Sequence, residues 1–256
     1  MAQCIAQTLS RADLGDSDQP TKAIAVIQAG TGVGKSAAYA STAIAMALER
    51  KTRVLISTAT VALQEQLMQK DLPALAAVME QPFVYALAKG RGRYVCKVKL
   101  ERLVGVGGAE EDMFEEEFPT AAMATASQEA LEERRTRMYE HMAHLLANAR
   151  WDGDRDSLND TPDPSDWATV AAERHTCTAR HCPRYRECSY YTARTQLAEA
   201  NVIVANHDLV LASLGMKTLP ELDNCLVVFD EGHHLPAVAL DQFSSAMDLT
   251  SLRWLV

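Results

Sequence analysis

The 256-residue sequence lacks several features that would each point to a definite class of protein. It lacks a net positive charge, since 25 lysines and arginines face 34 aspartates and glutamates, for a net charge of −9. This argues against a protein that coats nucleic acid through its overall charge, but leaves room for a local basic channel. No segment approaches the ~20 consecutive apolar residues of a membrane span, and the first residues do not resemble a secretion signal. We therefore expect a cytoplasmic protein with no membrane partner.

The sequence has only six cysteines and no Cys-x-x-Cys pair of the kind found in zinc knuckles. In a reducing compartment structural disulfides are rare, so metal ligation is the leading interpretation of a cysteine cluster. Cys177, Cys182 and Cys188 are separated by four and then five residues, and Cys96 lies upstream. Four thiolates can hold a [4Fe–4S] cluster or a tetrahedral zinc ion, and the wide, uneven spacing favours the iron–sulfur cluster.

The remaining cysteines and several histidines receive simpler interpretations. Cys4 and Cys225 lie outside the group, and Cys225, on an apolar run, is expected to be a small core residue. The histidines that offer alternative metal ligands are expected to be surface residues. They are His141, His144, His175 and His181.

A phosphate-binding loop is indicated by residues 29–36, Ala-Gly-Thr-Gly-Val-Gly-Lys-Ser, which follow the apolar run 23–27. The pattern predicts a strand over 23–29, a glycine turn and a helix that begins at Lys35. Glycines let the backbone wrap around an anion, and the helix N-terminus directs N–H groups toward it. Lys35 is expected to reach the β- and γ-phosphates and Ser36 to bind Mg²⁺. The predicted nucleotide-binding residues are Ala29, Gly30, Thr31, Gly32, Val33, Gly34, Lys35 and Ser36.

The second half of a nucleotide site is indicated far downstream. Residues 225–229 form a short apolar run, typical of a strand buried on both faces, and Asp230-Glu231-Gly232-His233 follows it. An Asp-Glu pair alone often only caps a helix. Together with the phosphate loop it predicts Mg²⁺-dependent hydrolysis of a nucleoside triphosphate, in which Asp230 holds Mg²⁺ and Glu231 orients or deprotonates the attacking water.

Strand and helix patterns alternate through most of the chain. Further strands are predicted over 53–58, 83–88 and 201–205, with helices over 1–14, 35–49, 61–69 and 192–199. Pro73 is expected to break the helical stretch that follows residue 61. The alternation predicts an α/β fold, a parallel sheet with helices on both faces. Residues 90–190 lack repeated strand patterns and contain a charged helix near 127–148, so we interpret them as an insertion.

Taken together, these motifs resemble the iron–sulfur helicases of superfamily 2, the XPD/DinG type, and most closely the bacterial DinG-type members. Residues 29–36 match helicase motif I, and Ala29 in place of the usual first glycine is common in helicases. Residues 57–67 match motif Ia, residues 230–234 match the DEAH-type box, and residues 205–210 resemble the Asn-His stretch of this family. The resemblance implies that the cluster ligands are Cys96, Cys177, Cys182 and Cys188.

The resemblance implies an ATP-dependent DNA helicase that moves 5′ to 3′ on single-stranded or forked DNA and uses ATP, Mg²⁺ and a [4Fe–4S] cluster. We expect it to be a monomer. The family role of His233 is to couple the ATP site to DNA. The implied architecture is a RecA-like P-loop NTPase domain interrupted by a mostly helical iron–sulfur insertion. Its expected segments are 1–89 and 192–236 for the RecA-like domain, 90–191 for the insertion and 237–256 for the start of an arch region.

Such helicases hydrolyse ATP between two RecA-like halves, and only one half is recognisable here. We therefore expect an N-terminal portion that binds nucleotide weakly and hydrolyses it poorly without the second half. Two other classes stay open from the residues alone. One is a non-motor P-loop module with a zinc-bound insertion. The other is a kinase or GTPase, for which motif Ia is foreign and no base-specificity element for GTP is visible.

Local support for DNA binding comes from basic residues around Tyr94, opposed in sequence only by Glu101. Basic groups neutralise phosphates and an aromatic ring can stack on a base. The alternative is a solvated basic loop beside a thiolate cluster, and the sequence does not separate the two. Three further tyrosines, 185, 190 and 191, are expected to pack around the cysteines. The basic residues are Lys89, Arg91, Arg93, Lys97, Lys99 and Arg102.

Overall fold

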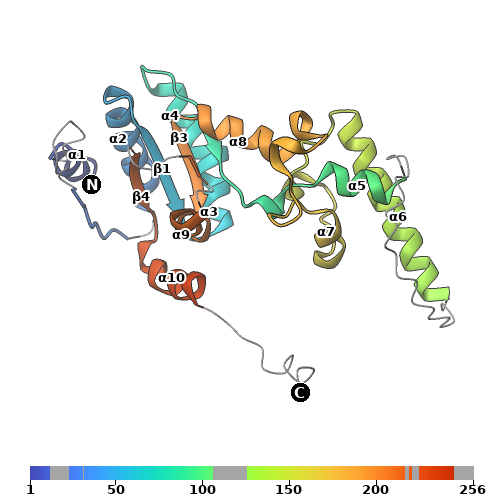
Figure 1. Cartoon of the computed structure of the whole chain (residues 1–256). Coiled ribbons are helices and arrows are strands. Elements are labelled where there is room, and N and C mark those ends of the chain that lie inside the picture. The colour runs from blue at the N-terminus through green and yellow to red at the C-terminus, as the bar shows by residue number, and fades with distance from the viewer. Residues whose placement is uncertain (12–22, 31, 106–125, 217–218, 221–224, 245–256) are drawn as a thin grey trace. The chain divides into compact units, whose positions relative to one another are not determined.

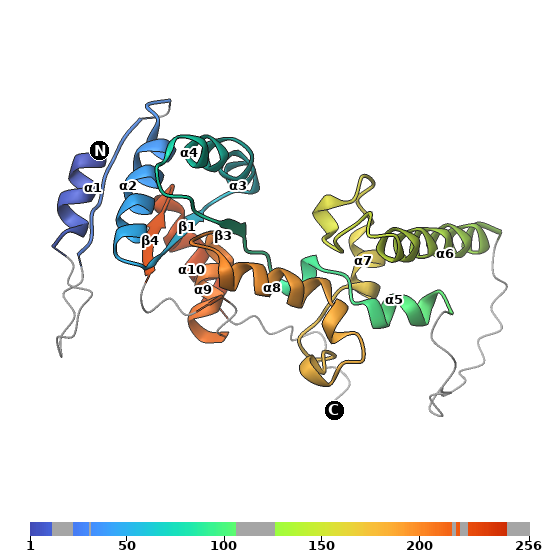
Figure 2. The same ribbon diagram turned by 90° about the horizontal axis from the view of Figure 1, so that it is seen from above.

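The computed structural model describes residues 1–11, 23–30, 32–105, 126–216, 219–220 and 225–244. The chain divides into two compact units. We call Met1–Lys89 together with Thr195–Val256 the sheet unit, and Gly90–Arg194 the helical unit. Figure 1 shows the elements of both, and Figure 2 shows them from above.

The sheet unit is built on four parallel strands in the order β2-β3-β1-β4. The strands are β1 (Arg53–Thr58), β2 (Tyr85–Leu87), β3 (Val202–Asn206) and β4 (Cys225–Phe229). The helices of this unit are α1 (Ala2–Leu9), α2 (Lys35–Glu49), α3 (Val61–Gln66), α4 (Leu72–Val78), α9 (His207–Met216) and α10 (Leu235–Phe243). Helix α8 (Ser189–Glu199) begins in the helical unit and ends in the sheet unit.

Strands β1 and β3 bury both of their faces under helices, because successive side chains of a strand point to opposite sides. On one face, Val54 and Ile56 of β1 pack with α1, α2 and the helical segment 61–78. On the other face, Leu55 of β1 and Ile203 of β3 pack with α8 and α9. Figure 2 shows α2 and α9 on opposite sides of the strands. The predicted α/β fold, a parallel sheet with helices on both faces, is confirmed.

The predicted strand over residues 23–29 is wrong. Residues 23–30 are irregular, and the side chains of Ile24 and Val26 are 82% and 94% exposed. Ile27 alone of this run packs against the core under α2. A strand needs hydrogen-bond partners for its backbone, and residues 23–30 pair with none of the described strands. An apolar run indicates a preference for burial, but it does not supply the neighbouring strand.

Two further local predictions are corrected. Strand β4 lies at the edge of the described sheet, and Val227 and Phe229 are each 42% exposed, so β4 is not buried on both faces. Pro73 does not break the helical stretch. The segment Leu67–Asp71 is a π-helical turn that leads into α4, and Pro73 lies in the first turn of α4. A proline is tolerated there because the first N–H groups of a helix have no partner within the helix.

The helical unit has a core of its own. Its helices besides the start of α8 are α5 (Lys97–Leu103), α6 (Ala126–Ala147) and α7 (Pro164–Val170). Among its described residues, strand-like pairing is limited to the isolated bridges Tyr94–Asp154 and Val95–Ala171. The buried core residues are Val95, Leu100, Tyr139, Met142, Trp151, Trp167, Val170 and Ala171.

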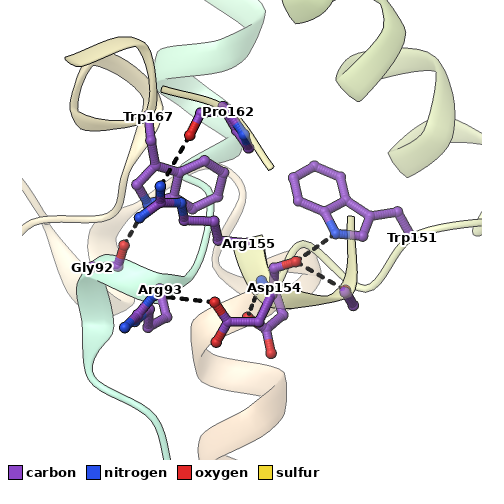
Figure 3. Close-up of polar contacts among 9 residues, drawn as sticks. Gly92, Arg93, Trp151, Asp154, Arg155, Pro162 and Trp167 are labelled. Carbon is purple, nitrogen blue, oxygen red and sulfur yellow. Dashed lines mark hydrogen bonds and ion pairs between the residues drawn. The ribbon is translucent and has the colours of Figure 1, made fainter. Parts of the chain in front are cut away.

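Two tryptophan side chains donate hydrogen bonds to loop carbonyls of the helical unit (Figure 3). Trp167 Nε1 donates a hydrogen bond to the Gly92 carbonyl at 2.6 Å, and Trp151 Nε1 donates to the Asp154 carbonyl at 2.7 Å. The guanidinium of Arg155 lies 6.0 Å from the Trp167 ring centre. Loop carbonyls lack the partners that a neighbouring strand provides, and here buried indole groups donate to them.

Among the described helices, none combines the length and the apolar character that crossing a membrane requires.

Candidate nucleotide-binding site

The phosphate loop leads directly into α2. Gly34 is the N-terminal cap residue of α2 with a φ of 75°, and Gly32 has a φ of 78°. Both angles lie in the left-handed region, which glycine adopts without strain. No described side chain caps α2, so its first N–H groups are available to an anion. Val33 is 65% exposed, so the loop is open to solvent. The predicted residue Thr31 lies outside the described residues.

Two predicted catalytic side chains meet although they are 196 positions apart. Lys35 Nζ donates a hydrogen bond to Glu231 Oε1 at 2.8 Å. This bond raises the pKa of Lys35 and lowers the pKa of Glu231, so both groups are charged near neutral pH. Lys35 begins α2 and Glu231 follows β4. The pair therefore lies at the carboxyl edge of the parallel sheet, where ligands bind in folds of this class.

Asp230 is buried, and both oxygens of its carboxylate accept hydrogen bonds. Oδ1 accepts from the Glu231 N–H at 3.0 Å, and Oδ2 accepts from the Tyr39 phenol at 3.0 Å. Burial, together with the negative charge of Asp230, raises the pKa of Tyr39, while the nearby Ser36 hydroxyl opposes this rise. The phenol therefore stays protonated and remains a donor. A carboxylate oxygen can accept more than one bond, so lone pairs remain for a cation.

Glu231 has an unusual backbone conformation. Its φ of 53° and ψ of 43° lie in the left-handed region, which costs about 1–2 kcal/mol for a residue with a side chain. Backbone strain of this kind concentrates at functional sites. Oε2 of Glu231 lies 3.4 Å from His233 Nδ1, and His233 is largely exposed. The turn after β4 therefore presents a carboxylate and an imidazole side by side.

Two buried residues of this site had no role predicted from the sequence, although one of them is the histidine of the 205–210 stretch. The first is Tyr39, whose position four residues after Lys35 places it on the same helix face, a usable signal. The second is His207, the first residue of α9, which is 1% exposed. Its Nδ1 lies 2.6 Å from Ser57 Oγ, and its Nε2 has no hydrogen-bond partner among the described residues. The Ser57 carbonyl in turn accepts from the Asp230 N–H at 2.8 Å.

The predicted cluster cysteines all lie in the helical unit as free, partly buried thiols. Burial raises the pKa of the Cys188 thiol, and the nearby Cys177 and Cys96 raise it further, so these three lie within electrostatic reach of one another. Nowhere in the described ranges do three or more His, Cys, Asp or Glu side chains converge as ligands of a metal ion do. Cys225, the first residue of β4, packs against the core shared with α8 and α9, where burial raises the pKa of its thiol to about 11.

The remaining histidines singled out by the sequence lie at the surface. All four are exposed, and none of them joins a metal-binding group within the part of the chain that the structure describes. The surface placement predicted for them is confirmed. These residues are His141, His144, His175 and His181.

The structure contradicts only the base-stacking role predicted for Tyr94. Tyr94 is 6% exposed and packs edge-on against Tyr190, with ring centres 5.8 Å apart, so it is not available to stack on a base. Glu101 pairs with Arg184 at 3.0 Å, and other carboxylates pair with three of the six basic side chains. Their ion pairs are Arg93–Asp156 at 3.1 Å, Lys97–Glu187 at 3.8 Å and Lys99–Glu173 at 2.8 Å. These carboxylates come from distant parts of the sequence, where local charge patterns do not reveal them.

Arg91 stacks on tyrosines next to the cysteines. Its guanidinium lies 4.2 Å from the Tyr190 ring centre and 5.7 Å from that of Tyr191. Tyr185 and Tyr191 are in ring contact at 4.6 Å, and Cys177 lies close enough to Tyr191 and Arg91 to affect the pKa of both. Tyr190 and Tyr191 therefore pack with Arg91, and Tyr191 lies beside the Cys177 thiol.

Comparison with known proteins adds independent findings. Residues 172–252 match the family model DEAD_2. The chain is 40% identical over 225 residues to the ATP-dependent DNA helicase DinG of Photobacterium profundum, a match that covers 87% of this chain and 31% of that protein. It is 37% identical over 226 residues to proteins of the same name from Escherichia coli strain K12 and Salmonella typhimurium, covering 88% of this chain and 30% of each. The chain thus spans less than a third of the length of these curated relatives.

The DEAD_2 match includes β3, β4 and the Asp230-Glu231 pair, together with Cys177, Cys182 and Cys188. The carboxylate half of the site and the closely spaced cysteines therefore lie within one matched region. The chain is thus similar to DinG proteins over most of its residues, and residues 172–252 match the DEAD_2 family model.

Proposed function

We propose that this chain is the N-terminal motor portion of a cytoplasmic ATP-dependent DNA helicase that moves 5′ to 3′ on single-stranded or forked DNA. The observation that carries the proposal is the contact of the phosphate-loop Lys35 with Glu231, the carboxylate at the end of β4. The names of the similar proteins, each an ATP-dependent DNA helicase, support the choice of ATP and DNA. The polarity follows from the resemblance to iron–sulfur helicases.

In the proposed site, the loop N–H groups and Lys35 bind the β- and γ-phosphates of ATP. To do so Lys35 leaves Glu231, and the released carboxylate can then accept a proton from the attacking water. Ser36 and Asp230 supply oxygen ligands, which are the kind that Mg²⁺ prefers, so the residues present fit this ion. When bound, Mg²⁺ neutralises charge on the phosphates. His233, next to Glu231, is proposed to couple this site to DNA.

The proposed domain arrangement assigns residues 1–89 and 192–236 to one RecA-like domain, residues 90–191 to an insertion and residues 237–256 to the start of an arch region. Efficient hydrolysis is proposed to require a second RecA-like domain, because a group that stabilises the transition state from a partner domain accelerates related NTPases by about 10³–10⁵. The proposed assembly is a monomer.

Replacing the phosphate-loop lysine tests the nucleotide site. Lys35→Met is expected to weaken Mg²⁺–ATP binding tenfold or more, since a hydrogen bond to a charged group is worth about 1.5–3 kcal/mol. The measurement is titration of the chain with a fluorescent ATP analogue, with circular dichroism to confirm the fold. Lys70→Met, at an exposed lysine of the same unit, is the matched control and is expected to bind like the unaltered chain. Equal affinity of Lys35→Met and the unaltered chain would contradict the proposal.

We also propose that Cys96, Cys177, Cys182 and Cys188 hold a [4Fe–4S] cluster in the helical unit. Four thiols in one unit suit the donor chemistry of such a cluster, and the cationic Arg91 beside Cys177 suits a group with thiolate ligands. When bound, the cluster supplies covalent iron–thiolate links between distant loops.

Purification without oxygen tests the cluster directly. The protein is expected to be brown, with broad visible absorption and iron bound in the stoichiometry of a cubane cluster. Replacing Cys182 by serine is expected to reduce the iron content, whereas Cys225→Ser, on β4, is expected to leave it unchanged. A colourless protein that contains one zinc ion per chain would instead support a zinc site.

A further inference from the structure

Helix α2 carries a buried phenol at the point where the two halves of the proposed nucleotide site meet. Tyr39 lies four residues after Lys35, on the same face of α2, and is 7% exposed. Its hydroxyl donates to Asp230 Oδ2 at 3.0 Å, a buried bond that joins α2 to the end of β4 across 191 positions. No family motif quoted from the sequence includes Tyr39.

The two hydrogen bonds to Asp230 restrict how its carboxylate can turn. The Glu231 N–H bonds to Oδ1 and the Tyr39 phenol bonds to Oδ2. Because the backbone N–H of Asp230 is itself bonded to the Ser57 carbonyl of β1, the residue is also held from its main chain. The remaining lone pairs of both oxygens then have defined directions.

The type of donor also matters. A phenol is neutral, so it orients the carboxylate without cancelling the charge that attracts a cation. A lysine or arginine in its place would neutralise Asp230 and compete with the metal ion. Hydrogen-bonded partners of metal-binding carboxylates act in this way in general, by fixing the orientation of the ligand.

We propose that Tyr39 is a positioning residue that holds Asp230 in the orientation that binds Mg²⁺ together with the nucleotide. This inference rests on the proposed function of the same site. Tyr39 touches neither nucleotide nor metal in this role. It acts through Asp230, and its position on α2 links the metal-binding carboxylate to the helix that carries Lys35 and Ser36.

Tyr39→Phe tests the proposal, because it removes the hydroxyl and keeps the ring that packs in the core. The fluorescent ATP analogue is titrated first in EDTA and then at increasing concentrations of MgCl₂. The Mg²⁺ concentration that gives half of the metal-dependent binding is expected to rise about 10- to 100-fold, the usual effect of losing such a partner. The affinity in EDTA is expected to stay unchanged. Tyr139→Phe is the matched control, since it removes a phenol that donates to the Asp166 carbonyl in the helical unit.

The readouts distinguish the possible failures. All titrations are made at a temperature at which circular dichroism shows each variant to be folded. An unchanged Mg²⁺ requirement in Tyr39→Phe overturns the positioning role, and so does an equal loss of affinity with and without Mg²⁺, which indicates packing alone. If the unaltered chain binds no nucleotide under any condition, the proposed function itself fails, and this inference fails with it.

Discussion

The two units of this chain satisfy their buried backbone groups in different ways. In the sheet unit, the bonds run between parallel strands, and Leu55 of β1 lies opposite Ile203 of β3 and Val227 of β4. In the helical unit, indole groups of Trp151 and Trp167 bond to loop carbonyls (Figure 3). The sheet unit therefore joins its strands at many equivalent positions, whereas the loops of the helical unit are joined by a few backbone bonds and by side chains. Single substitutions should affect the helical unit more strongly.

Gly153 gives the largest expected effect of a single substitution in the helical unit. Its φ of 86° lies in the left-handed region, and a Cβ atom there would collide with the side chain of Ser189. Gly153→Ala is expected to lower the free energy of unfolding of the helical unit by roughly 2–4 kcal/mol, because left-handed strain and overpacking add. Denaturant unfolding followed by tryptophan fluorescence measures this. Trp151 and Trp167 report on the helical unit, and Trp254, outside the described residues, is replaced by phenylalanine in all variants.

Gly105→Ala is the matched control for Gly153→Ala. Gly105 has a φ of 69°, but its surroundings are open, so only the left-handed strain of about 1–2 kcal/mol applies. A larger loss of unfolding free energy in Gly153→Ala than in Gly105→Ala supports a tightly packed turn at Gly153. Equal losses of unfolding free energy in both variants would show that the contact with Ser189 adds nothing to the cost at Gly153.

His207 offers a test in the sheet unit. The expected change in the free energy of unfolding is smaller there. Burial lowers the pKa of His207 below its ordinary value of 6.5, so the unfolded chain takes up a proton at a higher pH than the folded chain does. Its contribution to stability is therefore complete above pH 6.5 and is lost as the pH falls from 6.5 toward the lower pKa of the folded state. The free energy of unfolding of the sheet unit is expected to decline over this range.

The measurement is denaturant unfolding, followed by circular dichroism, at a series of pH values on both sides of 6.5. His207→Gln is expected to flatten the decline. His181→Gln, at an exposed histidine of the helical unit, is expected to leave it in place. If the pH dependence is the same in His207→Gln and in the unaltered chain, another group is responsible for it.

Much of the sheet unit could be predicted because buried parallel strands are continuous apolar runs. The bounds 53–58 and 225–229 agree with β1 and β4, and Lys35 begins α2 as expected. The run 23–29 has the same apolar character but no partner strand among the described residues, so the pattern alone was misleading there. Pro73 was misread because proline breaks a helix interior but not a first turn.

The helical unit was less predictable because its contacts depend on residues far apart in sequence. Lys99 is part of a basic run, yet its partner Glu173 lies 74 positions away. Tyr94 is an aromatic residue among basic ones, yet the fold buries it against Tyr190. Local composition indicates which charges are present, but it does not indicate which of them are neutralised.

The amino-acid sequence by itself determined the phosphate-loop pattern, the Asp-Glu pair after an apolar run and the cysteine spacing, because each depends on residues that are neighbours along the chain. Only the tertiary structure decided that Lys35 meets Glu231, that Tyr39 bonds to Asp230 and that His207 lies against Ser57. The physical reason is that parallel strands bring their carboxyl ends to one edge of the sheet. The order in which the strands pair, which local sequence does not specify, then sets which side chains meet.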